Sequence, residues 1–147
     1  MARTMGLDVG TRTIGVAVSD ELSITGQALT TLRRSNLRTD LRALCELIEK
    51  HGVNRIVVGL PLNMDGSEGP QAASCRQLGR ALAEASGIAV EHWDERLSTV
   101  AAERFLLEGD VSRRKRRNVV DSLAAAIILQ GWLDAHRPRS VENGEAE

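Results

Sequence analysis

The chain has 147 residues, the size of one domain or of one domain with a tail. Its 19 Lys and Arg residues nearly balance its 20 Asp and Glu residues, which argues against a simple polybasic nucleic-acid binder. Two cysteines and three histidines, without the spacing of metal ligands, argue against a disulfide framework and a zinc site. No apolar stretch is long enough to span a bilayer, so we expect a cytoplasmic protein without a membrane partner.

Three short apolar and β-branched runs open the chain, and the short turns between them suit antiparallel strands. These strands are predicted at residues 4–9, 14–19 and 24–32. Apolar residues then recur at helical spacing from Leu37 to Ile48, which predicts a helix that ends at Gly52. The apolar run at 55–59 predicts a strand that is buried on both faces.

The second half of the chain alternates between helical and strand patterns. A loop rich in Gly and Pro over 60–70 precedes a predicted helix at 71–85, and Gly87 ends this helix. Residues 88–93 predict a fifth strand.

Two more helices are predicted, over 98–109 and over 118–136, with a basic run between them. We expect residues 1–137 to form the domain and the acidic tail at 138–147 to be disordered. The element order predicts an α/β fold with a mixed five-stranded sheet, three antiparallel strands followed by two parallel ones, flanked by helices. Sites in such sheets form where the parallel strands present their C-terminal ends at one edge.

Asp8 lies near the end of a predicted buried strand. A carboxylate there costs several kcal/mol unless a partner or a metal ion satisfies it. Gly6, Gly10 and Gly15 would leave the backbone open for the close approach of a ligand. We therefore place Asp8 in a functional site, and the alternative is a buried Asp that caps its turn.

Glu95 directly follows the last predicted strand. If that strand is parallel to the first, Glu95 reaches the same sheet edge as Asp8. The alternative is a solvated loop acid paired with Arg96. Asp94 is the weaker candidate, because strand alternation turns it to the opposite face.

Asp121 lies in the predicted first turn of the last helix, where an acid often only complements the helix dipole. It shares a helix face with Ala124 and Ala125, and this small-residue face would leave space for a ligand.

Three carboxylates that converge from three elements, without His or Cys, favour a hard cation such as Mg²⁺ or Mn²⁺. Two ions about 3.5–4 Å apart can activate water and stabilise the leaving oxygen of a displacement. The predicted chemistry is phosphodiester hydrolysis, with two ions. The predicted catalytic residues and metal ligands are Asp8, Glu95 and Asp121.

The basic run supplies groups that could hold the substrate. It consists of Arg113, Arg114, Lys115, Arg116 and Arg117. The run precedes Asp121 on the predicted connecting loop, and arginine binds phosphate in a bidentate manner. Most basic runs are only solvated charge, which is the alternative here.

Four segments in order resemble the YqgF (RuvX) family of ribonuclease H-like nucleases, over residues 5–134. They are GLDVGTRTIGVAVSD at 6–20, IVVGLPLNMDGSEGPQA at 56–72, DERLST at 94–99 and SRRKRRNVVDSLAAAIILQ at 112–130. The resemblance implies a ribonuclease H-like fold and metal-dependent nuclease activity, with the family's acidic site at Asp8, Glu95 and Asp121. It also implies a role in maturing the 5′ end of the precursor of 16S ribosomal RNA.

The resemblance further implies a substrate groove beside the loop that follows the fourth strand. Asn63 and Gly66 would lie near phosphate there, and Arg12 and Arg96 could also contact nucleic acid. Each of these residues could equally serve the shape of the protein or pair with a nearby acid. Nucleic acid is thus the predicted partner, ribosomal RNA precursor or branched DNA, for a monomer or a homodimer.

Other functions compete with this interpretation. The family has also been described as Holliday-junction resolvases, although only three acids map onto this chain. A non-catalytic nucleic-acid-binding factor of transcription or ribosome assembly would keep the basic run without needing three acids. An actin-like ATPase would use the Asp-x-Gly-Thr hairpin for phosphate, but it requires two such domains.

Overall fold

The computed structural model describes residues 3–97 and 113–136, with the backbone alone over 113–120. The elements follow the predicted order. They are β1 (Arg3–Val9), β2 (Thr13–Ser19), β3 (Gly26–Arg33), α1 (Leu37–His51), β4 (Val53–Leu60), α2 (Pro70–Ser86), β5 (Val90–Asp94), the 3₁₀ turn η1 (Glu95–Leu97) and α4 (Arg113–Ala135).

The five strands of the described residues form one mixed sheet in the order β3-β2-β1-β4-β5. The pairs β3–β2 and β2–β1 are antiparallel, whereas β1–β4 and β4–β5 are parallel. The prediction of three antiparallel strands followed by two parallel ones is confirmed. Because β1, β4 and β5 run in the same direction, their C-terminal ends lie at one edge of the sheet.

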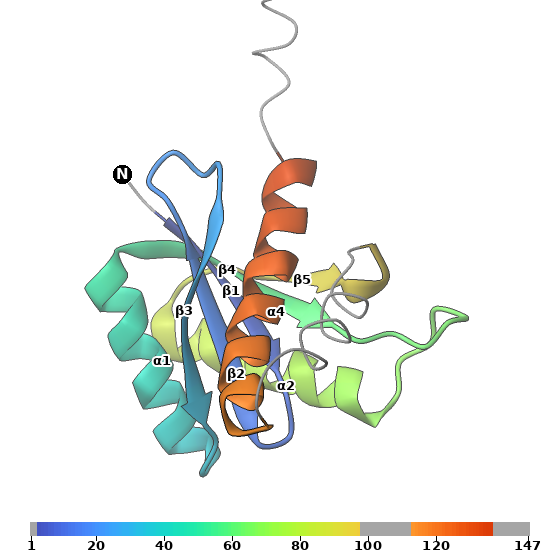
Figure 1. The fold of residues 1–147 in the computed structure, drawn as a ribbon. Coiled ribbons are helices and arrows are strands. Elements are labelled where there is room, and N and C mark those ends of the chain that lie inside the picture. Colours follow the sequence, from blue (N-terminus) through green and yellow to red (C-terminus); the bar gives the residue numbers. More distant parts are fainter. Residues whose placement is uncertain (1–2, 98–112, 137–147) are drawn as a thin grey trace, which may run out of the picture.

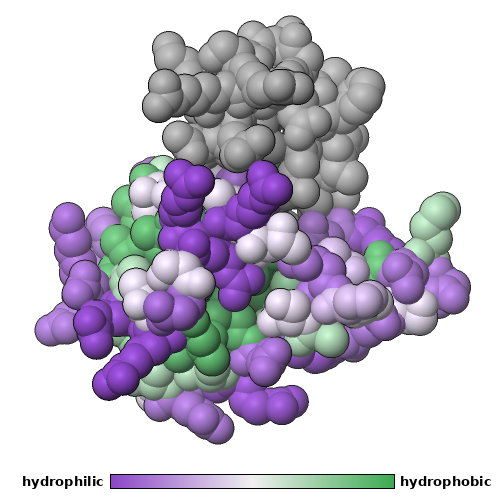
Figure 2. Space-filling view, turned by 90° about the horizontal axis from the view of Figure 1, so that it is seen from below, coloured by the Kyte–Doolittle hydropathy of each residue, from purple (hydrophilic) through white to green (hydrophobic). Residues whose placement is uncertain are grey.

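The helices cover the two faces of the sheet unequally (Figure 1). On one face, α1 and α2 pack over large apolar side chains such as Met5, Leu7 and Ile56. On the other face, α4 is the helix of the described residues that crosses the sheet, and it buries a second apolar cluster around Ala125 and Leu129. The surface shown in Figure 2 carries hydrophilic residues around a smaller apolar area.

Local signals set the ends of the helices. The Asn36 side chain accepts a hydrogen bond from the Thr39 backbone N–H and so caps the start of α1. Gly52 ends α1 with a left-handed backbone, φ 63°, which a residue with a Cβ adopts only at a cost. The same device, Gly87 with φ 73°, ends α2 as predicted.

The start of the last helix differs from the prediction. Helix α4 begins at Arg113, so the basic run is helical and does not form a connecting loop. Arginine and lysine are good helix formers, so a polar segment without apolar periodicity continues the helix. The helix predicted over 98–109 and the tail at 138–147 lie outside the described residues. Among the described helices, none has the length and apolar character to cross a membrane.

Helix α4 approaches the sheet closely because β1 has no side chain at Gly6. A Cβ at Gly6 would lie 2.7 Å from Leu129 Cβ and 3.0 Å from the carbonyl oxygen of Ala125. We expect Gly6→Ala to lower the free energy of unfolding by about 1–3 kcal/mol, because the helix must move outward. Urea denaturation followed by circular dichroism measures the change. An unchanged midpoint would mean that α4 does not rest on β1.

Candidate active site at the edge of the sheet

Asp8 is the half-exposed residue of a strand end that is otherwise buried. Its neighbours Leu7 and Val9 face the α1–α2 side, where both belong to the apolar core. Strand alternation places Asp8 on the opposite side together with Gly6, beneath α4. The carboxylate therefore lies at the C-terminal edge of the sheet, on the face that α4 covers.

A glycine flanks Asp8 on each neighbouring strand. Gly15 of β2 is its direct partner across the antiparallel pair. On the parallel side, Leu7 pairs with Val58, so the register brings Gly59 of β4 next to Asp8. Because neither flanking residue has a side chain, other groups have room to pack beside Asp8.

On the β4 side of Asp8, the Glu95 side chain fills the space that Gly59 leaves. It is the first residue of η1, immediately after β5 ends, as predicted. A Cβ at Gly59 would lie 3.2 Å from Glu95 Oε2. The half-buried side chain of Glu95 therefore lies over Gly59, on the same face as Asp8.

On the β2 side of Asp8, the backbone of Asp121 lies over Gly15. A Cβ at Gly15 would overlap the carbonyl group of Asp121, so α4 can pass here only over glycine. Thr13 Oγ1 donates a 2.5 Å hydrogen bond to Asp121 Oδ2, which fixes one carboxylate oxygen. Asp121 lies in the third turn of α4 instead of the predicted first turn, because the helix begins earlier.

Two sequence interpretations of this region are wrong in their physical reason. Gly6 and Gly15 do permit a close approach, but the approaching group is α4 and not a ligand. Likewise, Ala124 and Ala125 are 2% and 0% exposed and pack on the sheet, so their face leaves no space for a ligand. Small residues on a helix and glycines on a strand together form one close helix–sheet contact.

The electrostatic surroundings of Cys75 agree with this arrangement. Burial, followed by the negative charges of Glu95 and Asp8, raises the pKa of the Cys75 thiol to about 12. Cys75 lies on α2, and its Sγ is 3.7 Å from the Val9 carbonyl oxygen. The pKa of this one thiol therefore depends on the charges of both carboxylates.

The donor set fits a hard cation in its chemistry, because carboxylate oxygens are the ligands that Mg²⁺ and Mn²⁺ prefer. Within the described residues, however, no group of three or more His, Cys, Asp or Glu side chains is arranged to hold one ion. Asp8 lies between the other two acids, so Asp8–Glu95 and Asp8–Asp121 are the two pairs that the sheet brings side by side.

The residues predicted to contact nucleic acid differ in the contacts that they make within the protein. Asn63 donates from Nδ2 to Ser67 Oγ at 2.9 Å, within its own loop. Arg96 pairs with Asp94 at 2.8 Å and donates to the Met64 carbonyl oxygen at 3.2 Å, which ties this loop to η1. Both residues therefore shape the loop beside Glu95, which Figure 1 shows projecting from the body of the protein.

Arg12 is exposed in the turn between β1 and β2, at the same edge as Asp8. The side chains of the basic run 113–117 lie outside the described part of the chain, although its backbone is the first part of α4. At about 1.5 Å per residue, the run ends about 6 Å before Asp121 along the helix.

Three side chains that make hydrogen bonds at this edge were not predicted. Besides Thr13, Gln71 donates from Nε2 to the Val9 carbonyl oxygen at 2.7 Å and fastens the start of α2 beside Asp8. Arg34 donates to the Gly10 carbonyl oxygen at 2.9 Å and pairs with the buried Asp40 at 3.4 Å. The partners lie far apart in the sequence or in an irregular turn, so no local pattern predicts them.

Comparisons with known proteins agree on one family. The model of the RuvX family, described as Holliday junction resolvase, matches residues 2–135. A protein of Myxococcus xanthus named "Putative pre-16S rRNA nuclease" is 62% identical over 136 residues, covering 92% of this chain and 90% of that protein. A relative of the same name from Moorella thermoacetica is 60% identical over 132 residues, covering 90% and 94%.

Two solved structures with a similar fold are distant in sequence. The structure described as T. thermophilus RuvC in complex with Holliday junction substrate has a TM-score of 0.59 at 14% identity, covering 92% of this chain and 95% of that one. The Fowlpox virus resolvase, solved with Holliday junction DNA, has a TM-score of 0.51 at 8% identity, covering 92% and 99%. The likeness supports the predicted ribonuclease H-like fold.

The pKa of Cys75 tests the placement of the two carboxylates without any cleavage assay. In a Cys45→Ser background with EDTA, we expect alkylation of Cys75 to rise only well above pH 9, the ordinary thiol pKa, because the thiol pKa is about 12. Asp8→Asn and Glu95→Gln should each move this profile to lower pH, since each removes a negative charge near the thiol. The increase in the thiol pKa that burial causes should remain in both variants.

Mass spectrometry of alkylation rates from pH 7 to 11 gives the profile. The matched control is Asp134→Asn, at an exposed acid near the end of α4, which should leave the profile unchanged. Identical profiles for the parent and both site variants would contradict the placement of Asp8 and Glu95 around Cys75.

Proposed function

Because the chain belongs to the RuvX family, we propose that it is a nuclease that hydrolyses phosphodiester bonds with divalent cations held by Asp8, Glu95 and Asp121. The observation that carries the proposal is the pair of glycines beside Asp8. Gly59 admits the Glu95 side chain, and Gly15 admits the backbone of Asp121. Negative charges concentrated around one partly buried strand end repel one another, and bound cations would offset that repulsion.

Each acid has a role that its position supports. Asp8, Glu95 and Asp121 would together hold the Mg²⁺ or Mn²⁺ ions, and Asp8 lies between the other two acids. Bound cations of this kind supply an activated water and stabilise the leaving oxygen. Thr13 holds Oδ2 of Asp121, which leaves the other carboxylate oxygen to turn toward Asp8. Gln71 and Arg34 hold the backbone on which Asp8 is carried.

The proposed substrate is the precursor of 16S ribosomal RNA, cut at the 5′ end of the mature sequence. Support comes from the relatives that carry this name and are more than half identical over nearly the whole chain. A branched DNA substrate is the second candidate, because the family model is described as Holliday junction resolvase. Arg12 and the basic run 113–117 are the proposed phosphate contacts on the two sides of the acids.

The proposed chemistry requires each carboxylate. We expect Asp8→Asn, Glu95→Gln and Asp121→Asn each to reduce cleavage of a 16S ribosomal RNA precursor at least about 100-fold, because each removes stabilisation of transition-state charge. Cleavage is measured with purified protein and Mg²⁺ or Mn²⁺, on the RNA precursor and on a four-way DNA junction in parallel. Faster cleavage of the junction would make branched DNA the substrate.

Asp134→Asn is the matched control, because it changes an exposed acid of α4 away from the site and should cleave like the wild type. Full activity in Asp8→Asn would contradict the mechanism. An inactive wild type with salt-sensitive RNA binding would favour the non-catalytic binding factor, and ATP turnover without nucleic acid would favour the ATPase.

The basic run makes a separate prediction about binding. Replacing Arg113, Arg114, Arg116 and Arg117 by Ala should reduce the slope of log K against log salt on single-stranded RNA by up to about 2.8, since each lost phosphate contact removes about 0.7. Fluorescence anisotropy across salt concentrations measures the slope. Replacing two exposed arginines of α1, Arg38 and Arg42, is the control. An unchanged slope in the quadruple variant would mean that the run is only solvated.

A further inference from the structure

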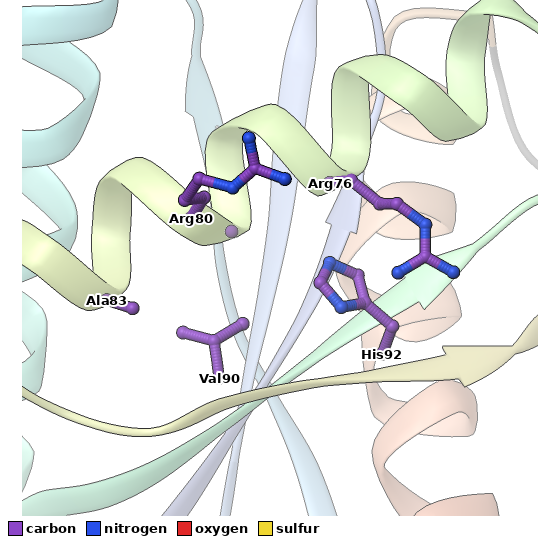
Figure 3. A pocket seen from close by; sticks show the side chains of 6 residues that line it. Arg76, Arg80, Ala83, Val90 and His92 are labelled. Atoms are coloured by element: carbon purple, nitrogen blue, oxygen red, sulfur yellow. The ribbon is translucent and has the colours of Figure 1, made fainter.

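A small hollow lies between α2 and the edge strand β5, apart from the three carboxylates (Figure 3). Its volume is about 120 Å³. Three basic side chains line it, namely Arg76 and Arg80 from α2 and His92 from β5, together with small or apolar residues. A hollow of this size has room for one phosphate group.

His92 has a buried nitrogen without a partner. Among the described side chains, its Nε2 is one of the buried polar atoms that make no hydrogen bond. The ring reaches from β5 toward α2 (Figure 3), where a Cβ at Gly79 would lie 2.9 Å from Nε2. Because Gly79 has no Cβ, the His92 ring packs directly against the backbone of α2 at the wall of the hollow. A buried polar atom without a partner in a native fold needs an explanation, and a ligand of the hollow would supply one.

The two arginines keep donors available for such a ligand. Arg76 uses only its Nε in the 2.8 Å hydrogen bonds to Glu68 that the described residues show, so its terminal amino groups are available. Arg80 has no ion pair within the described residues, and its exposed side chain can swing over the hollow. Arginine binds phosphate oxygens through a planar set of donors, so the ligand best matched to these groups is phosphate.

The His92 ring can change its protonation state when an anion binds beside it. Burial, followed by the charge of Arg76, lowers the pKa of His92, which favours the neutral ring. A phosphate beside the ring would favour the protonated form, in which Nε2 donates a hydrogen bond. The hollow thus gains a third donor when phosphate is bound.

We propose that this hollow binds one backbone phosphate of the nucleic acid on which the nuclease acts, at a distance from the scissile bond. This inference rests on the proposed function. His92 on β5 lies three residues before Glu95, the first residue after this strand, which is about 10 Å along the chain. Because His92 faces α2 and Glu95 faces α4, the bound strand would cross the C-terminal end of β5 between the two sites. A free phosphate or nucleotide is the other source of the same chemistry.

Binding is measured without cleavage, in the Asp8→Asn background with EDTA, by fluorescence anisotropy of a labelled single-stranded RNA. We expect Arg80→Ala to reduce the slope of log K against log salt by about 0.7, the value of one phosphate contact. Arg80→Glu should weaken binding further. Arg42→Ala, an exposed arginine of α1 outside the hollow, is the matched control and should leave the slope unchanged.

Nitrogen NMR of the His92 ring gives a second readout, assigned by the loss of its signals in His92→Gln. Addition of RNA should change the chemical shift of His92 Nε2 in the protein that retains Arg80. The change should be smaller in the Arg80→Glu variant. An unchanged salt slope together with an unshifted His92 ring would overturn the proposal. A shift with inorganic phosphate but none with RNA would also overturn it, because the hollow would then bind free anions.

The outcomes separate this inference from the proposed function. If the wild type cleaves RNA normally but Arg80 and His92 do not respond to it, only the hollow is refuted. If the wild type does not cleave any substrate while the Arg80 effect on binding is present, the hollow stands as a nucleic-acid contact and the nuclease proposal fails.

Discussion

The contact between helix α4 and the glycines of the sheet determines the arrangement of the whole site. Gly6 lets the helix approach β1, and Gly15 lets the backbone of Asp121 pass over β2. The last described turns bury Trp132 and Leu133, and the Trp132 ring stacks on His136 at 4.2 Å between centroids. An alanine in place of these glycines would lift the helix and carry Asp121 away from Asp8.

This contact has an electrostatic consequence. Packing would normally exclude charge from a helix–sheet junction, yet three carboxylates lie at its open end. Like charges in a partly buried place repel each other, and a divalent cation is the partner that removes this cost most completely. The glycine positions therefore serve two purposes, because they allow dense packing beneath α4 and admit the acids at the sheet edge. The proposed nuclease chemistry depends on the second purpose.

Much of the fold could be predicted because its signals are local. The spacing from Leu37 to Ile48 and the glycine at 52 determine α1, and the parallel strands follow from their buried apolar runs. The start of α4 could not be predicted from periodicity, since the basic run has no apolar face. The role of Gly6 and Gly15 could not be predicted either, because the sequence indicates a close approach at a glycine but not which group approaches it. Thr13 and Asp121 are 108 residues apart, and no local pattern reveals their hydrogen bond.

The central claim is that the acids around Asp8 bind divalent cations. A crystal structure of the protein soaked with Mn²⁺, with an anomalous difference map, tests it most directly. We expect anomalous peaks about 2.0–2.2 Å from Asp8 oxygens, shared with Glu95 or with Asp121. An ordered site that contains all three carboxylates but shows no peak beside Asp8 at saturating Mn²⁺ would contradict it.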